Sequence, residues 1–225
     1  MCFESSSLSS NTESQYGHAL FSDIILSPSL PLLKNLNKYY IVYQNSILKI
    51  YTKTGDDGTT GLQGDRRILK SDPRIIAYGN IDEVNSLLGV ISSHGLDEDI
   101  SKIFTRVQNE LFVAGADLSN PDLEDGKNRV NESMIKKLES EIDMFENELE
   151  PLTNFILPGG DHVAALIHFA RTVARRAETQ IITLEQNEKI NIHCKMYVNR
   201  LSDLLFVMAR VVNKRKNTPD IIWSP

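Results

Sequence analysis

A short glycine- and threonine-rich stretch, residues 51–61, has the composition of a phosphate-binding loop. Its three glycines allow backbone turns with positive φ and close approach to a ligand. Lys53 and four threonine hydroxyls supply donors that suit phosphate oxygens, while Asp56 and Asp57 could hold a magnesium ion indirectly or fix the loop. The same residue types are ordinary turn formers, so a surface turn is the alternative. The stretch is not a Walker A loop, because G-x-x-x-x-G-K-[ST] occurs nowhere in the chain.

Two arginines four residues apart, Arg171 and Arg175, share a helical face with Glu178. At about 100° per residue the three side chains fall within roughly 60° of one another, and Arg176 points elsewhere. Two arginines on one ridge repel each other unless an anion or a carboxylate lies between them. The spacing leaves two alternatives open: an anion-binding ridge, or a solvated face on which Arg175 pairs with Glu178.

A polar stripe follows a later helical segment. Asn199 and Asp203 are four residues apart and share a face with Phe206 and Arg210, away from the main apolar arc. A polar face opposite the core is usually just hydrated, and it can also be the face shown to another subunit.

Asp82 lies close to the core face of an earlier, otherwise apolar segment. A carboxylate in that position needs a cation, and Arg171 or Arg175 is the natural candidate. A purely structural role for Asp82 is the alternative.

Composition and missing motifs exclude several other functions. A net charge of -6 argues against a general nucleic-acid binder, and no run of roughly 18 apolar residues predicts a membrane span. The two cysteines exclude a disulfide framework and fit a reducing compartment, so we expect a cytoplasmic protein. No Glu-x-x-His pair, metal-ligand histidine spacing or G-x-S-x-G motif is present, and we expect His162 and His168 in packing or at the surface.

The elements that position these residues are helical. After Asp72, apolar residues recur with a period near 3.6, and Asp72-Pro73 is itself a helix-start signal. We expect helices over residues 72–95, 98–115, 132–149, 161–185 and 191–216. Five helices with short or moderate connections predict an all-α protein, an up-down five-helix bundle preceded by the glycine- and threonine-rich loop.

Three regions follow from this pattern. Residues 1–48 are serine-rich and poor in core-forming residues, which predicts a weakly ordered extension. This extension has neither the basic leader of a secretory signal nor the arginines of a transit peptide. Residues 49–217 form the predicted bundle, and residues 218–225, including Trp223, form a tail to which the sequence assigns no role.

Six motifs together resemble the signatures of the PduO-type ATP:cob(I)alamin adenosyltransferase family, whose fold is a bundle of this kind. In chain order they are 51–61 (YTKTGDDGTTG), 70–74 (KSDPR), 77–85 (AYGNIDEVN), 155–160 (FILPGG), 170–178 (ARTVARRAE) and 197–203 (YVNRLSD). The resemblance covers about Ile50 to Arg210 and does not extend to the preceding residues.

The resemblance implies that the 5′-deoxyadenosyl group of ATP moves to the cobalt of cob(I)alamin, giving adenosylcobalamin and triphosphate. It implies a homotrimer with active sites between subunits, and it suggests a corrinoid reductase and a B12-dependent enzyme as further partners. Magnesium is expected on the ATP phosphates, without protein ligands. The ATP-binding residues that it implies are Thr52, Lys53, Thr54, Gly55, Asp56, Thr59, Thr60, Lys70, Arg171, Arg175, Glu178 and Asn199.

The resemblance also implies three residues for the corrinoid half of the site. Asp82 and Arg171 match an ion pair between subunits, and Phe155 matches the aromatic residue that displaces the lower axial ligand of cobalamin. Which of Arg66 and Arg67 faces the ligand stays open.

Two other functions are weighed against the enzyme. One is a regulatory module that binds ATP without turnover, and the other is a structural trimeric bundle whose arginines pair with carboxylates. Phe155, Asp82 and Asn199, present together with Lys53, favour an active enzyme.

Overall fold

The computed structural model describes residues 51–63, 66–126 and 129–224. The helices of the described chain all belong to one compact unit, residues 53–225. The predicted extension, residues 1–48, lies outside the described residues.

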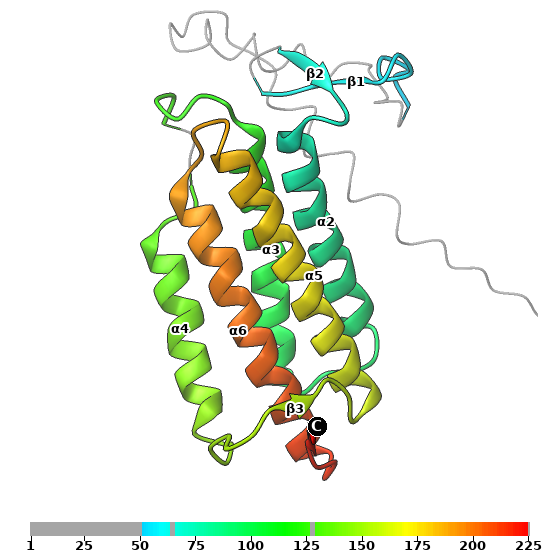
Figure 1. Cartoon of the computed structure of the whole chain (residues 1–225), viewed down its shortest axis with the longest axis vertical. Coiled ribbons are helices and arrows are strands. Elements are labelled where there is room, and N and C mark those ends of the chain that lie inside the picture. Colours follow the sequence, from blue (N-terminus) through cyan, green and yellow to red (C-terminus); the bar gives the residue numbers. More distant parts are fainter. Residues whose placement is uncertain (1–50, 64–65, 127–128, 225) are drawn as a thin grey trace, which may run out of the picture. The chain divides into compact units, whose positions relative to one another are not determined.

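Five helices make up most of the described chain, which confirms the predicted helical bundle (Figure 1). They are α2 (Pro73–Ser92), α3 (Glu98–Ser119), α4 (Glu132–Glu146), α5 (His162–Glu185) and α6 (Ile192–Arg215). Helix α5 packs between α2 and α6, α3 packs against α2, and α4 packs against α6. In the described ranges, none of the helices combines the length and apolar character that crossing a membrane requires.

Side-chain caps explain where the helices begin. The Asp72 carboxylate accepts from the Arg74 amide at 2.8 Å, and the Asp161 carboxylate accepts from the Val163 amide at 2.9 Å. Each cap satisfies an amide that has no partner within its own helix. The predicted end of the second helix at Gly115 was wrong, because α3 continues for another turn to bury Leu118.

The core is formed by the apolar faces that the period near 3.6 predicts. Ile81, Leu88, Phe104 and Ile167 are all less than 3% exposed. Burial of one such side chain stabilises the fold by about 1.5–3 kcal/mol.

Two arginines, one buried and one exposed, form ion pairs that fix the direction of α2 relative to α5. Arg74 is 1% exposed, and its guanidinium bonds the Glu188 carboxylate at 2.8 Å just beyond α5. Further along α2, Glu83 pairs with Arg176 of α5 at 2.5 Å. The start of α2 therefore lies beside the end of α5, and the two helices run antiparallel.

Two short sheets flank the helices, and the sequence analysis predicted neither. Strand β1 (Thr59–Gly61) pairs antiparallel with β2 (Arg67–Leu69), and β3 (Ile156–Leu157) pairs antiparallel with β4 (Ile221–Ile222). Strands of two or three residues are too short to produce a detectable alternation. The C-terminal tail thus has a structural role, since β4 holds the segment that precedes α5.

The predicted position of Arg210 on the polar stripe of α6 was wrong. Arg210 is only 9% exposed, and its guanidinium donates to the Asp220 carboxylate at 2.8 Å and to the Glu150 carbonyl at 2.9 Å. The tail folds back over the last turns of α6 and covers this side chain.

Gly160 must be glycine for two reasons. Its φ is +105°, and a Cβ at this position would lie 2.2 Å from Asn213 Oδ1. We expect Gly160→Ala to destabilise the fold by about 2–4 kcal/mol, through backbone strain and the displaced Asn213. Urea unfolding would measure the loss. Gly159→Ala is the matched control, because a Cβ there meets nothing within 4 Å, and an equal loss in both variants would contradict the explanation.

Candidate functional site

Arg171 and Arg175 line one cavity of about 370 Å³ where α4, α5 and α6 meet. Within the described part of the chain, neither guanidinium has a carboxylate at ion-pair distance. Arg176, next along the helix, is paired with Glu83. Arg171 and Arg175, the ridge, therefore carry positive charge without a direct ion pair, although the Glu146 carboxylate lines the same cavity. Guanidinium groups in this state are suited to bind an anion.

The environment of Arg171 is unusual for an arginine. Its Nε is buried and has no hydrogen-bond partner among the described residues, and its guanidinium lies 5.9 Å from the centre of the Phe206 ring. Burial, and then the charge of Arg175, lower the pKa of Arg171. A bound anion would supply both the missing acceptor and the missing charge.

The third arginine of the cavity differs from the two of the ridge, because it is paired with carboxylates. Arg200 lines the same cavity, but its guanidinium bonds Asp203 at 2.7 Å and Glu139 at 3.1 Å. Glu178 does not pair with Arg175; its carboxylate accepts from the Asn199 amide at 2.9 Å. The solvated face on which Arg175 pairs with Glu178 is thus not what this chain forms.

A second cavity, of about 770 Å³, adjoins the ridge. Its lining includes Phe155 and Trp223, and it shares Arg171 and Phe206 with the first cavity. The Phe155 side chain is 80% exposed, and its ring meets the Trp223 ring edge to face at 6.4 Å. A broad aromatic surface therefore lies directly beside the two arginines.

The strap, defined as residues 53–61, is held in shape by Asp57 and Arg67. Asp57 Oδ1 accepts from the Thr59 amide at 2.9 Å and from the Thr59 hydroxyl at 2.7 Å, and these bonds lower the pKa of Asp57. Arg67 donates to the Thr59 hydroxyl at 3.1 Å and to the Thr54 carbonyl, and lies 3.7 Å from Asp57. Asp57 and Arg67 thus fix the conformation of the strap.

Two lysines belong to the strap or lie on it. Lys53 has a φ of +60°, an uncommon conformation for a residue other than glycine. Lys70 packs over Gly55, since a Cβ at Gly55 would lie 3.0 Å from Lys70 Nζ, and its amide bonds the Gly58 carbonyl at 2.9 Å. The absence of a side chain at Gly55 lets the Lys70 ammonium approach the backbone of the strap. Of the other residues predicted to bind ATP here, Asp56 of the strap and Thr52 just before it are exposed, and Thr60 lies in β1.

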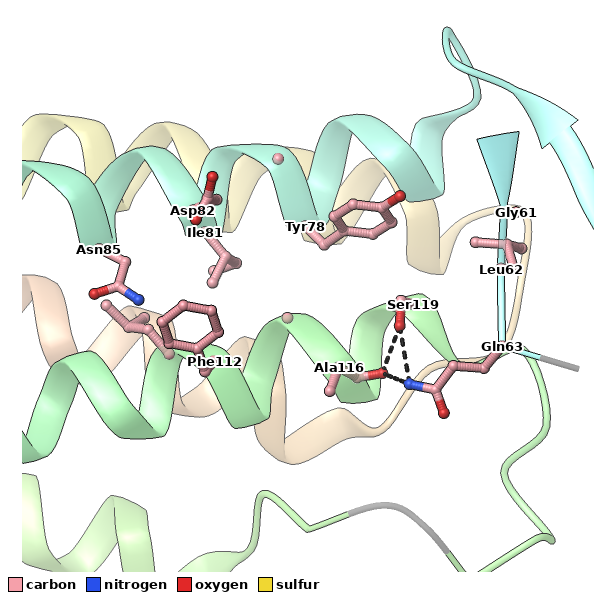
Figure 2. Close-up of a pocket in the computed structure, with 13 residues that line it drawn as sticks. Gly61, Leu62, Gln63, Tyr78, Ile81, Asp82, Asn85, Phe112, Ala116 and Ser119 are labelled. Carbon is pink, nitrogen blue, oxygen red and sulfur yellow. Dashed lines mark hydrogen bonds between the residues drawn. The ribbon is translucent and has the colours of Figure 1, made fainter. Parts of the chain in front are cut away.

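A third cavity, of about 600 Å³, lies between α2 and α3 (Figure 2). Tyr78 and Asp82 line it from α2 and the exposed Phe112 lines it from α3. Gln63 reaches from the segment after β1 and donates to the Ala116 carbonyl at 2.9 Å. Asp82 thus faces the α2–α3 cavity, whereas Arg171 faces α6, and one chain does not bring them together.

The strap and the arginine ridge lie at different heights along the bundle. The strap precedes α2, whose first turn is bonded to Glu188 at the end of α5. Arg175 lies ten residues before Glu185, where α5 ends, which is about 15 Å along the helix axis. One chain therefore carries two separate groups of cationic side chains, at different levels along the bundle.

None of the histidines in the described ranges lines one of these three cavities. His168 is buried and packs against Phe206 with ring centres 6.0 Å apart, and burial lowers its pKa. Within the ranges that the structure describes, no three His, Cys, Asp or Glu side chains are grouped to hold a metal ion.

Comparison with known proteins identifies the family. The family model described as "Cobalamin adenosyltransferase" matches residues 50–212. A corrinoid adenosyltransferase of Mycobacterium tuberculosis (strain H37Rv) is 42% identical over 185 residues, which cover 80% of this chain and 94% of that relative. The corrinoid adenosyltransferase of Bacillus subtilis (strain 168) is 42% identical over 181 residues, covering 79% of this chain and 93% of the relative.

The solved structures agree with this result. A variant of the PduO-type ATP:corrinoid adenosyltransferase from Lactobacillus reuteri, complexed with cobalamin and ATP, superposes with a TM-score of 0.74. It is 37% identical, and the match covers 79% of this chain and 100% of that chain. By sequence and by fold, this chain belongs to the cobalamin adenosyltransferase family.

Proposed function

We propose that this protein transfers the 5′-deoxyadenosyl group of ATP to the cobalt of cob(I)alamin, giving adenosylcobalamin and triphosphate. The observation that carries the proposal is the arginine ridge, whose Arg171 and Arg175 lie beside the aromatic cavity of Phe155 without an ion pair among the described residues. A polyphosphate fits the ridge, and a large flat cofactor fits the aromatic cavity. The Lactobacillus reuteri relative is complexed with these two substrates, cobalamin and ATP.

The reaction needs alignment and charge stabilisation more than proton transfer. The cobalt(I) electron pair attacks C5′ of the ribose, the cobalt–carbon bond forms, and the C5′–oxygen bond breaks with its electrons leaving on triphosphate. Arg171, Arg175, Lys53 and Lys70 would stabilise the charge that develops on this leaving group. Because no proton moves, no general base is required.

Magnesium is proposed to bind with ATP. Asp57, one of the two strap carboxylates, is already bonded to Thr59 and lies 3.7 Å from Arg67, and we propose that the phosphates supply the metal's ligands. When bound there, the ion would neutralise part of the phosphate charge. We also propose that Asn199 and Glu178, which are bonded to each other one turn from Arg175, contact the nucleotide.

We place each active site between two protomers of a homotrimer. The separation of the strap from the arginine ridge supports this arrangement, because a neighbouring chain could bring its strap to the ridge. The opposite orientations of Asp82 and Arg171 support it too, since the pair would form only across an interface. Thr52–Thr60 of one protomer would then close over triphosphate that Arg171 and Arg175 of the next hold.

Charge exchange tests this interface. We expect Asp82→Arg to weaken trimer assembly at least tenfold, because two cations would face each other, about 1.4 kcal/mol per interface. The double variant Asp82→Arg/Arg171→Asp should restore assembly, as measured by analytical ultracentrifugation. Asp143→Arg, an equal charge change on the exposed face of α4, is the control. Failure of the double variant to recover would argue against the pair.

The reaction also implies partners. Cobalamin must be reduced to cobalt(I) before it attacks, which calls for a corrinoid reductase, and the product is the coenzyme of a B12-dependent enzyme. A reducing compartment, the cytoplasm, suits both the reduced corrinoid and the free buried thiol of Cys194.

One assay tests the function. Protein, MgATP and chemically reduced cobalamin are mixed, and the absorbance change from cob(I)alamin to adenosylcobalamin is followed together with triphosphate release. We expect one triphosphate per adenosylcobalamin. Binding of ATP without turnover would instead support a regulatory module, and neither binding nor turnover would support a structural bundle.

A further inference from the structure

The position of Phe155 is not fixed by burial of its own side chain. The ring is 80% exposed and stands on the segment 150–161, between α4 and α5. An exposed ring gains little from packing, so the backbone of this segment must determine where the ring points.

Two buried side chains of α6 anchor the ends of this segment. Arg210 donates to the Glu150 carbonyl at 2.9 Å. Asn213 donates to the Gly159 carbonyl at 3.0 Å and accepts from the Asp161 amide at 2.9 Å. Arg210 is 9% exposed and Asn213 is 2% exposed, so these bonds are shielded from water.

Asp220 joins the two anchors to the C-terminal tail. After α6 the chain reverses at Asn217, whose φ is +54°, and the Thr218 amide bonds the Asn213 carbonyl at 2.9 Å. The Asp220 carboxylate then accepts from Arg210 Nε at 2.8 Å and from Asn213 Nδ2 at 3.3 Å. One carboxylate therefore holds the tail against both anchor residues.

From Asp220 the tail runs directly to Phe155. Strand β4 pairs with β3, and the Trp223 amide donates to the Phe155 carbonyl at 2.8 Å. The Trp223 ring meets the Phe155 ring edge to face, and both rings line the 770 Å³ cavity with Arg171. The middle of the segment is thus held by the tail, and its ends are held by α6.

We infer that Arg210, Asn213 and Asp220 form a latch that positions Phe155 for the corrinoid half of the reaction, with Asp220 as its central positioning residue. The inference rests on the proposed function. The latch touches neither half of the ATP site, so it acts on the lower face of the corrinoid and not on ATP binding. Bonds that only stabilised the end of α6 would not need to join the tail to both ends of the Phe155 segment.

Asp220→Asn tests the latch, because it keeps the shape of the side chain and removes the charge that holds Arg210. We expect kcat/KM for cob(II)alamin, with reduced flavin as electron donor, to fall at least tenfold. Reaction with preformed cob(I)alamin, which has no lower ligand to displace, should stay within threefold of wild type. Electron paramagnetic resonance of cob(II)alamin with MgATP should show the signal of four-coordinate cobalt(II) reduced by a similar factor, while ATP affinity in calorimetry is unchanged.

Asp97→Asn is the matched control. Asp97 bonds Arg215 at 2.9 Å near the same end of α6, but it has no bond to the Phe155 segment. It should match wild type in every measurement. Trp223→Ala, at a half-exposed side chain, should shift the same cob(II)alamin measurements in the same direction as Asp220→Asn.

The outcomes separate this inference from the proposed function. Equal losses with cob(I)alamin and cob(II)alamin in Asp220→Asn would overturn the latch and leave it a stabilising cap. Wild-type behaviour of Asp220→Asn and Trp223→Ala, in an assay where Phe155→Ala is impaired, would also overturn it while the adenosyltransferase function stands. No turnover by the wild-type protein would overturn the proposed function itself.

Discussion

Arg175→Ala should lower kcat/KM for ATP by about a hundredfold or more, since a lost contact to developing charge costs about 2.7–4 kcal/mol. Arg175 lies in the cavity of about 370 Å³ and is exposed, with no carboxylate partner among the described residues. Its removal should therefore leave the helical content and the unfolding midpoint unchanged. Steady-state kinetics at varied MgATP, with circular dichroism on the same samples, would measure both effects.

A second arginine provides the control for that experiment. Arg129 precedes α4, and its guanidinium lies 3.9 Å from Asp117, away from all three cavities. Arg129→Ala removes the same functional group and should retain near wild-type kinetics. If Arg175→Ala also kept its kinetics, the ridge would have no part in holding triphosphate.

Phe155→Ala should impair the reaction of cob(II)alamin far more than that of preformed cob(I)alamin. We expect a loss of roughly a hundredfold with cob(II)alamin and reduced flavin, equivalent to about 2.7 kcal/mol in the barrier. Without the ring, water or the lower base can stay on cobalt, and the five-coordinate ion is harder to reduce. With cob(I)alamin, which has no lower ligand, the loss should remain below about threefold, or roughly 0.7 kcal/mol.

The two oxidation states serve as each other's control in this experiment. Because the Phe155 side chain is 80% exposed, its truncation should not alter thermal unfolding. Electron paramagnetic resonance of the complex with MgATP should lose the four-coordinate cobalt(II) signal. Equal losses with both corrinoids would show that the ring only packs against Trp223.

The sequence predicted most of the fold because helices are local. Apolar residues at a period near 3.6, with Asp72 and Asp161 as caps, place five helices close to where they occur. Strands β3 and β4 pair residues about 65 positions apart through two residues each, which no local pattern can show. The burial of Arg210 could not be predicted for the same reason, since its partner Glu150 lies 60 residues away.

The candidate site was predictable in composition and not in arrangement. Spacing alone left Arg175 either paired with Glu178 or free to bind an anion. In the structure Glu178 is bonded to Asn199 of another helix and not to Arg175, and anion binding by Arg175 stays a prediction. Asp82 and Arg171 line different cavities of the single chain, so the proposed pair between them stays a prediction.

The different heights of the strap and the arginine ridge in one chain have a consequence for inheritance. If each working centre combines halves from two copies, a copy defective only in its strap and a copy defective only in its ridge can still assemble some complete centres together. Two alleles that each encode an inactive protein could then restore enzyme activity when both are expressed. Dilution of the protein would abolish turnover under the same condition, because dissociated copies have no complete centre although their helices stay folded.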